Sequence, residues 1–392
     1  MLPSFEIERF RTFSHLVIPR LGRVNLIVGR NGAGKTMLLE ALRLYASGGD
    51  WGALARILYD RDEVLGGQQP VEEGAEPFVR LESLFHGRQP LLGTENAIRL
   101  QRSAQDPCAL QMELKAYRQI PSKESLTGYE HRPLEGTSLP ADPDVLLGIM
   151  LSVGDRKRES IVVPSVTKYR FYWERLGHKI WPSLAFIRAG ETDVQSMARQ
   201  WDNVALADGE NRVYDYLRLV APIQRIAAVE HPERRGQRTF VVRLDGTAEP
   251  VPLKSLGDGI LRILQIALAL EGAGKAGERQ NDVGGDAPAS GQTAEATYAR
   301  LALIDEVENG IHYSVLPDLW RFLIKVAKLR DLQVFAATHS WDCVEAFQYA
   351  AAKEEDSDAV LIRLERKGDA NRAVIFTGDE LPIVTRHGIE VR

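Results

Sequence analysis

The chain of 392 residues begins with short apolar segments divided by polar turns, and these predict a buried strand followed by a helix. Residues 23–28 are mostly apolar, which is typical of a strand in a parallel sheet. Leu38, Leu42 and Tyr45 then follow at the i, i+4 and i+7 spacing of one helix face. Beyond residue 300 the pattern predicts a strand, a helix and a strand, over 301–304, 316–323 and 333–337. This alternation is typical of an α/β fold with a parallel sheet.

Further strand-like segments lie on both sides of this centre, at 5–10, 15–18, 78–85, 97–100, 110–114, 359–364 and 373–376. Those that follow the first helix are short and have alternating polarity, and we expect them to form an antiparallel subdomain beside that helix. The last two are interpreted as the closing strands of the main sheet.

The middle of the chain gives weaker patterns. Residues of about 115–250 include a stretch with Pro and Gly over 121–143, helical patterns over 196–217 and a strand over 239–244. We interpret this region as a helical, variable insertion. Residues of about 271–300 are small, polar and rich in Gly and Ala, which is typical of a mobile loop. With no internal repeat, residues 1–392 are expected to form a single domain that carries both insertions.

Composition narrows the class of protein. Hydrophobic residues make up 44% and charged residues 26%, which is ordinary for a soluble globular chain. No apolar run approaches the roughly 18–20 residues that span a bilayer, and no secretory signal is evident, so we expect no membrane association. The two cysteines, Cys108 and Cys343, lie far apart, which fits a reducing cytoplasm. A net charge of −5 does not favour nucleic-acid binding, although a local basic face remains open.

The turn after the first buried strand, GRNGAGKT over 29–36, matches the P-loop pattern in full. Its glycines allow backbone N–H groups to surround phosphates, its lysine adds positive charge, and its last hydroxyl can ligate Mg²⁺. The strand before it and the helix after it are the context that this motif requires. The sequence therefore predicts a site for a nucleoside triphosphate and Mg²⁺, with these candidate ligands: Gly29, Asn31, Gly32, Ala33, Gly34, Lys35 and Thr36.

Two later strands end in polar residues that suit the same site. The apolar run 301–304 leads into Asp305, a candidate Mg²⁺ ligand, and Glu306, which can polarise the attacking water. The run 333–337 leads into Thr-His-Ser, and His339 could hydrogen-bond the γ-phosphate. Ligands of α/β proteins bind at the carboxyl ends of such strands, so we expect both groups beside the P-loop.

A second turn, KSLGDG over 254–259, precedes an apolar helical run. Free amides and the positive dipole end of a helix make such a turn a candidate anion site, through Ser255, Gly257, Asp258 and Gly259. One γ-phosphate does not need two such turns in one chain, whereas two chains placed head to tail could each cover the other's nucleotide. A simple helix-capping turn is the alternative.

In this order, the P-loop, the SLGDG turn, IDE and THS resemble the ABC-type ATPase heads of the RecF, SMC and OLD families. LIDEVENGIHYSVLPDLW and FAATHSWDCVEAF are similar more narrowly to the AAA-type ATPases of the OLD group, which includes the ATPase subunit of PARIS-type anti-phage systems. The resemblance covers about residues 1–50 and 250–350. It implies a P-loop NTPase with an ABC-ATPase-like head: a mixed, mainly parallel sheet flanked by helices, an antiparallel β subdomain and a helical insertion.

The resemblance also implies a function. It predicts an enzyme that hydrolyses ATP to ADP and phosphate, assembles into a homo-oligomer through head-to-tail heads, and acts as a sensor or scaffold in anti-phage defence. A phage protein or DNA would be the trigger, and a separate TOPRIM-type nuclease or toxin the effector. The alternative is a RecF- or SMC-like repair ATPase that clamps DNA directly. A transporter subunit is disfavoured, because the long insertion differs from the compact helical subdomain of such subunits.

Several positions depart from the family pattern. The common ABC signature is LSGGQ, and Gly257 stands where its serine would be. The contact to the γ-phosphate of the partner copy could therefore come from backbone amides or from Ser255. His86 and Gln89 are weak candidates for the Q-loop. The candidates for adenine contact are Phe10, Arg11 and Phe13.

Two further features bear on partners. Only 53 residues follow His339, too few for a TOPRIM domain, and they show no carboxylate cluster, so any nuclease is expected on a separate chain. The stretch TKYRFYWERLGHKIW over 167–181 interleaves basic and aromatic residues. It could bind nucleic acid, but an element that packs its aromatic residues inward is the favoured interpretation.

Overall fold

A computed structural model describes the chain except residues 66–77, 90, 103–105, 124–128, 137–141, 143, 155, 163–183, 191, 248, 274–299, 355, 369, 379 and 382–392. The basic-aromatic stretch and nearly all of the predicted mobile loop lie outside the described residues. No helix within the described ranges is long and apolar enough to cross a membrane.

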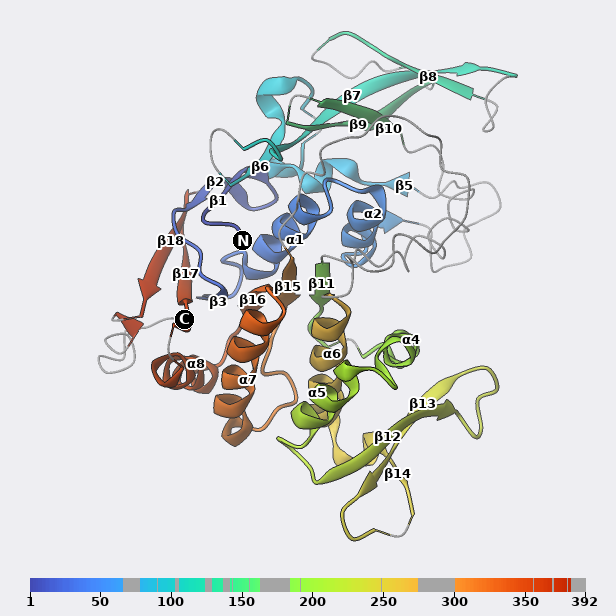
Figure 1. Ribbon diagram of the computed structural model, residues 1–392. Coiled ribbons are helices and arrows are strands. Elements are labelled where there is room, and N and C mark those ends of the chain that lie inside the picture. Colours follow the sequence, from blue (N-terminus) through green and yellow to red (C-terminus); the bar gives the residue numbers. More distant parts are fainter. Residues whose placement is uncertain are drawn as a thin grey trace.

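A six-stranded sheet forms the centre of the molecule (Figure 1). Its strands, in spatial order, are β11 (Leu184–Ile187), β15 (Leu301–Ile304), β16 (Gln333–Ala337), β3 (Val24–Gly29), β17 (Ala359–Lys367) and β18 (Ala370–Thr377). Neighbours pair in parallel except β17 and β18, which pair antiparallel. The predicted parallel sheet and its two closing strands are confirmed.

Both faces of this sheet are covered, which explains its continuous apolar strands. Along β15, Leu301 and Leu303 pack on one side, and Ala302 and Ile304 pack on the other. The first side is covered by α1 (Lys35–Ala46) and α2 (Trp51–Tyr59). The helices on the second side are α4 (Val194–Val204), α5 (Asp208–Leu217), α6 (Asp258–Gly272), α7 (Leu316–Leu329) and α8 (Trp341–Lys353).

An antiparallel sheet lies beyond α1 and confirms the predicted subdomain (Figure 1). Its order is β10 (Arg156–Val162), β9 (Val145–Val153), β7 (Leu110–Pro121), β6 (Ile98–Gln101), β1 (Phe5–Phe10) and β2 (Phe13–Ile18), with β8 (Tyr129–Pro133) beside β7. Asn371 joins the two sheets, because its side-chain amide donates to the Thr12 carbonyl at 2.8 Å.

Two predicted elements were wrong. The expected strand over 78–85 shrinks to β5 (Phe78–Val79), which pairs with β4 (Val64–Leu65) and is followed by short 3₁₀ turns, η1 (Leu81–Leu84), η2 (His86–Arg88) and η3 (Thr94–Asn96). Leu81 and Leu84 are both buried, and their i, i+3 spacing suits a 3₁₀ turn better than a strand.

The predicted insertion over 115–250 also differs from the expectation, because it is helical only in part. Strands form the described residues of its first part. β7 alternates buried and half-buried residues over 110–116, continues to Pro121 and pairs with β8 and β9. The helices described in this insertion, α4 and α5, lie in the region predicted from the helical pattern at 196–217.

The insertion ends in a small three-stranded sheet, β12 (Ile223–Glu230), β13 (Arg238–Leu244) and β14 (Val251–Pro252). It extends beyond α4 and α5 at the end of the molecule remote from the antiparallel sheet (Figure 1). The 3₁₀ turn η4 (Leu253–Leu256) then leads the chain into α6, so this sheet positions the start of that helix.

Candidate nucleotide site

The P-loop connects the end of β3 to the start of α1, as the motif requires. Lys35 opens α1 and is buried, and its Nζ donates to the carbonyl oxygens of Gly29 at 2.7 Å and Arg30 at 3.2 Å. Burial lowers the pKa of Lys35, while the charges of nearby carboxylates, Asp305 foremost, oppose that shift. The ammonium group is therefore held inside the loop, where phosphates would bind.

Gly34 shows why this loop needs glycine. Its φ of 101° lies in the left-handed region, and a Cβ atom there would lie 2.6 Å from the Phe13 ring. The ring belongs to β2, so the antiparallel subdomain presses directly on the P-loop.

Gly34→Ala is accordingly expected to lower the free energy of unfolding by roughly 2–4 kcal/mol, from backbone strain together with overpacking. Gly32→Ala is the matched control. It adds the same methyl at φ 78°, but nothing lies within 4 Å of it, so only about 1 kcal/mol of strain is expected. Urea denaturation of the two variants measures the difference, and equal losses would contradict the Phe13 contact.

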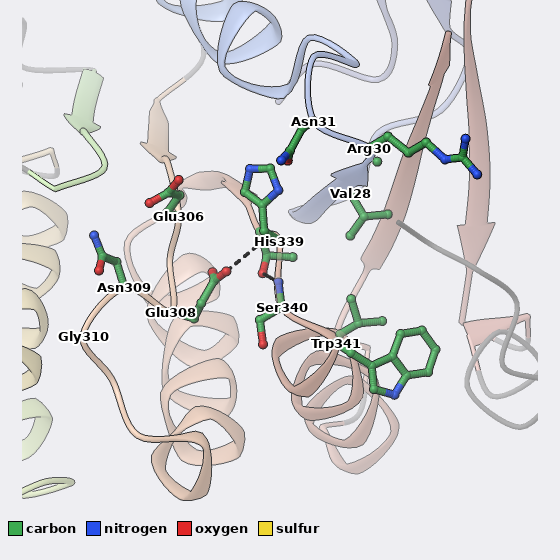
Figure 2. A pocket seen from close by; sticks show the side chains of 13 residues that line it. Val28, Arg30, Asn31, Glu306, Glu308, Asn309, Gly310, His339, Ser340 and Trp341 are labelled. Atoms are coloured by element: carbon green, nitrogen blue, oxygen red, sulfur yellow. Dashed lines mark hydrogen bonds between the residues drawn. The ribbon is translucent and has the colours of Figure 1, made fainter. Parts of the chain in front are cut away.

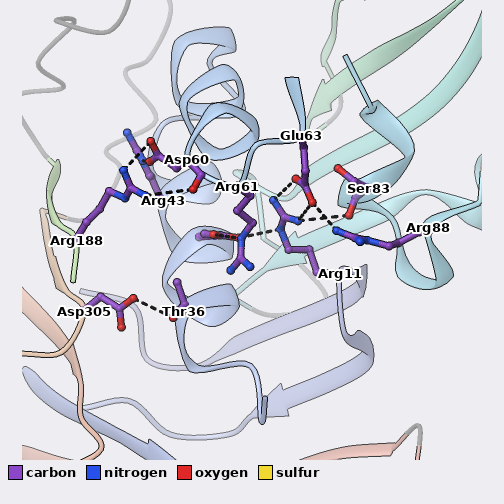
Figure 3. A network of polar contacts seen from close by, with 11 residues as sticks. Arg11, Thr36, Arg43, Asp60, Arg61, Glu63, Ser83, Arg88, Arg188 and Asp305 are labelled. Atoms are coloured by element: carbon purple, nitrogen blue, oxygen red, sulfur yellow. Dashed lines mark hydrogen bonds and ion pairs between the residues drawn. The ribbon is translucent and has the colours of Figure 1, made fainter. Parts of the chain in front are cut away.

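Thr36 and Asp305 meet from two different elements. The Thr36 hydroxyl donates to Oδ2 of Asp305 at 2.9 Å (Figure 3). A hydroxyl and a carboxylate are hard oxygen ligands of the kind that Mg²⁺ prefers, so this donor pair fits the ion. Thr36 and Asp305 would hold Mg²⁺, which when bound offsets the negative charge of the phosphates.

The ends of β15 and β16 bring the other predicted residues together. Glu306 and His339 line one cavity of about 870 Å³, together with Gly29 and Asn31 of the P-loop. In Figure 2 the His339 ring lies beside Asn31, with Glu306 across the opening. The structure thus places both residues next to the P-loop, as expected from parallel strands that end at one edge of a sheet.

The backbone around Glu306 is unusual. Glu306 has φ 46°, a left-handed conformation that costs a non-glycine residue on the order of 1–3 kcal/mol. Its neighbours are fixed by hydrogen bonds from Asp305 N to Ile187 O at 2.8 Å and from Val307 N to Ala337 O at 3.1 Å. The adjoining strands therefore maintain this conformation at the site.

Two charged residues that the motifs did not reveal stabilise this region. Glu308 accepts the backbone N–H of His339 at 3.0 Å, and so fixes the turn that carries the imidazole (Figure 2). Arg262 of α6 is 5% exposed and donates to the Asp305 carbonyl and, at 3.0 Å, to the Glu306 carbonyl. Burial lowers the pKa of Arg262 to about 10, against the opposing charges of the carboxylates, so it remains protonated at neutral pH. A lone arginine within an apolar helical run was the available signal for it.

The second turn is not part of the lining of this cavity. Ser255, Gly257 and Asp258 are exposed, and within the described part of the chain neither they nor Gly259 line the cavity with Glu306 and His339. Gly257, at φ 97°, is the N-cap residue of α6, while the Ser255 hydroxyl donates locally to Pro252 O at 2.7 Å. The head-to-tail use of this turn stays a prediction.

The adenine candidates are not available for stacking. Phe10 and Phe13 are fully buried. Arg11 is buried and forms ion pairs with Glu40 at 2.8 Å and with Glu63 at 2.9 Å, the second of which is labelled in Figure 3. Because a buried arginine requires paired carboxylates, this turn is explained by packing between the antiparallel sheet and α1.

The Q-loop candidates are also displaced from the site. His86 Nδ1 bonds to the Arg11 carbonyl at 3.0 Å, and neither His86 nor Gln89 lines the described cavities beside Thr36 and Asp305. Instead, Arg188 and Ala189, just after β11, line a cavity of about 230 Å³ together with Thr36 and Asp305.

Comparisons with known proteins agree with this geometry. A family model described as "AAA domain, putative AbiEii toxin, Type IV TA system" matches residues 120–342, and one described as "AAA domain" matches residues 4–105. An "ATP/GTP phosphatase" of Helicobacter pylori is 21% identical, over 88% of this chain and 87% of that protein.

Among solved structures, an SMC head bound to the C-terminal winged-helix domain of ScpA has a TM-score of 0.47 at 11% identity, covering 96% of this chain and 98% of that one. The SMC head domain from Thermotoga maritima has a TM-score of 0.41 at 13% identity, with the same coverages. The first family model spans more than half of the chain. The chain is an ATPase of the AAA type and belongs to the family described by that model.

Proposed function

We propose that this ATPase is a sensor in bacterial anti-phage defence, related to the OLD group and to PARIS-type ATPase subunits. ATP would clamp two copies head to tail. A phage protein or DNA would then control the release of a separate effector, either a TOPRIM-type nuclease or a toxin.

The hydrolytic site has a residue for each requirement of phosphoryl transfer. Lys35 and the loop amides would bind the phosphates, and Thr36 and Asp305 would hold Mg²⁺. Glu306 accepts the proton of the water that attacks the γ-phosphorus, so that the Pγ–O bond to ADP breaks and phosphate leaves. His339, at the end of the neighbouring strand β16, hydrogen-bonds a γ-phosphate oxygen.

The observation that carries the clamp is the exposed turn at the start of α6. The first N–H groups of a helix have no acceptor within it, and α6 has 15 residues, so its N-terminal end favours an anion. Within the described residues, this turn does not line the cavity beside its own P-loop. A second copy would supply the missing anion.

The separate effector is proposed from the resemblance to the OLD group. Among the described residues, one group of three side chains could hold a metal ion: Glu6, Glu8 and His15. Its carboxylates already accept from His15 at 2.8 Å and from Arg99 at 3.0 Å. These contacts already account for the group.

The clamp is tested by light scattering with and without Mg-ATP. The mass of the parent protein is expected to double with ATP, while Ser255→Arg stays monomeric because the new side chain covers the exposed turn. Leu329→Arg is the matched control and should still dimerise, since this exposed residue ends α7 at the opposite edge of the sheet. ATP-dependent doubling of Ser255→Arg would contradict the role of the turn.

The sensor role is tested in cells. The chain, expressed with the reading frames that flank its gene, is expected to lower phage plating, and Glu306→Gln should abolish that protection. Equal plating with and without the chain would overturn the defence role. An ATPase rate that rises several-fold with DNA alone would support the repair clamp instead.

A further inference from the structure

Arg262 connects the exposed turn to the catalytic strand end. It lies on α6, four residues after Asp258, the first residue of that helix. It is the only charged residue between 260 and 270 and is almost fully buried. Burying a guanidinium group costs desolvation free energy, and apolar side chains of similar size stabilise a helix at least as well. Packing alone therefore does not explain Arg262.

Its donors are directed at backbone carbonyls of the site. One terminal nitrogen donates to the carbonyl oxygens of Asp305 and Glu306, and the other donates to the Arg188 carbonyl at 2.7 Å and to Oε1 of Gln265 at 3.0 Å. A single side chain therefore contacts the Mg²⁺ ligand, the candidate base and the end of β11. Charge-assisted bonds of this kind are about twice as strong as neutral ones.

These bonds act on the strained residue. Glu306 has φ 46°, and its carbonyl is one of the groups that Arg262 holds. A change at Arg262 would release that peptide and let the Glu306 carboxylate turn away from its position in the cavity. Displacements of about 1 Å at a reacting group can lower a rate by about 100-fold.

A second contact joins the same elements. A Cβ atom on Gly259, in the first turn of α6, would lie 2.4 Å from the Gly310 carbonyl oxygen. Gly310 lines the same cavity as Glu306. The start of α6 is thus packed against the segment that follows the candidate base, and a shift of the helix has to move that segment.

We propose that Arg262 is a positioning residue that couples the exposed turn to Glu306. Nucleotide that is held by one copy and bound at its partner's turn would then control the rate of hydrolysis in the partner's own site. The inference rests on the proposed roles of Glu306 and of the head-to-tail clamp. Hydrolysis in the two sites of the dimer would then be concerted, and a monomer would hydrolyse slowly even with ATP bound.

The test uses Arg262→Lys and Arg262→Gln in the full chain. For both we expect kcat to fall roughly 10- to 100-fold, less for lysine, which keeps one charge-assisted donor. KM and ATP affinity are expected to stay within about threefold, since no phosphate ligand is removed. The Mg-ATP dimer should still form, but specific activity should no longer rise with protein concentration.

Arg212→Gln is the matched control. Arg212 makes a bidentate ion pair with the fully buried Glu271 in the last turn of the same helix, at 2.7 and 2.8 Å, but contacts nothing in the site. It should lower the melting temperature and leave kcat within about twofold. If kcat falls equally in Arg212→Gln and Arg262→Gln, the role of Arg262 is structural and the proposal is overturned.

Other outcomes are equally decisive. A raised KM with unchanged kcat in Arg262→Lys would also overturn the proposal, and this variant decides the matter should the glutamine variant not fold. If Arg262→Gln hydrolyses ATP normally while Glu306→Gln is inactive, only the coupling fails. If Glu306→Gln keeps its turnover, the proposed base itself is wrong.

Discussion

Glu306→Gln is expected to lower the rate of ATP hydrolysis by roughly two to four orders of magnitude, while ATP still binds. Glutamine keeps the shape of the side chain but does not accept the proton of the attacking water. The backbone should not change, because Arg262 and the neighbouring strands hold the peptide groups around residue 306. Single-turnover phosphate release measures the rate, and fluorescence titration with an ATP analogue measures the affinity.

Glu308→Gln provides the control for charge. It removes the same negative charge from the same cavity, yet a glutamine oxygen can still accept the His339 N–H. A loss below about tenfold is expected for it, because no proton transfer is affected. Equal losses in both variants would show that charge near the phosphates, and not a base at Glu306, determines the rate.

Glu306→Gln is also expected to change the assembly of the protein. With hydrolysis blocked, the γ-phosphate should remain between Lys35 of one copy and the Gly257 turn of its partner, so Mg-ATP should hold Glu306→Gln as a lasting dimer. Adding Ser255→Arg should prevent this. A substitution at Gly259 would not serve, because the new side chain would clash with Gly310 of its own chain.

The motifs at strand ends were predictable because their positions follow from topology. A parallel sheet places the ends of β3, β15 and β16 at one edge, so Lys35, Asp305 and His339 had to lie near one another once the strands were recognised. Apolar runs of four to six residues between turn signals were sufficient to recognise these strands.

Residues whose roles depend on distant partners were not predictable. Arg11 is a candidate for adenine contact from the sequence alone, because it lies in a turn that resembles that of the family. Its partners, Glu40 and Glu63, lie 29 and 52 residues further along the chain, and no local pattern joins them. The role of Arg262 was not predictable for a similar reason, since three of its four acceptors are backbone carbonyls, which a sequence does not distinguish.

Lys35→Met is expected to weaken ATP binding by about 100-fold or more, because it removes a charge-assisted contact worth on the order of 3 kcal/mol. Methionine retains most of the buried aliphatic stem, so the loss of ATP affinity measures the contribution of the ammonium group. Arg30→Met is the control. It removes the same charge from the same loop, but its side chain points away from His339 and Asn31 (Figure 2), and a change below about fivefold is expected.

Thermal melting without nucleotide separates binding from folding in these variants. Burial lowers the pKa of Lys35 below its value in the unfolded chain, so at neutral pH the protonated amine opposes folding, and this cost fades as the pH rises through the folded pKa. Lys35→Met removes that cost but also the two bonds to the carbonyls of Gly29 and Arg30, so the two effects oppose each other. We therefore expect the melting temperature to change little while added Mg-ATP no longer raises it. A variant that is still stabilised by Mg-ATP as strongly as the parent would contradict the P-loop assignment.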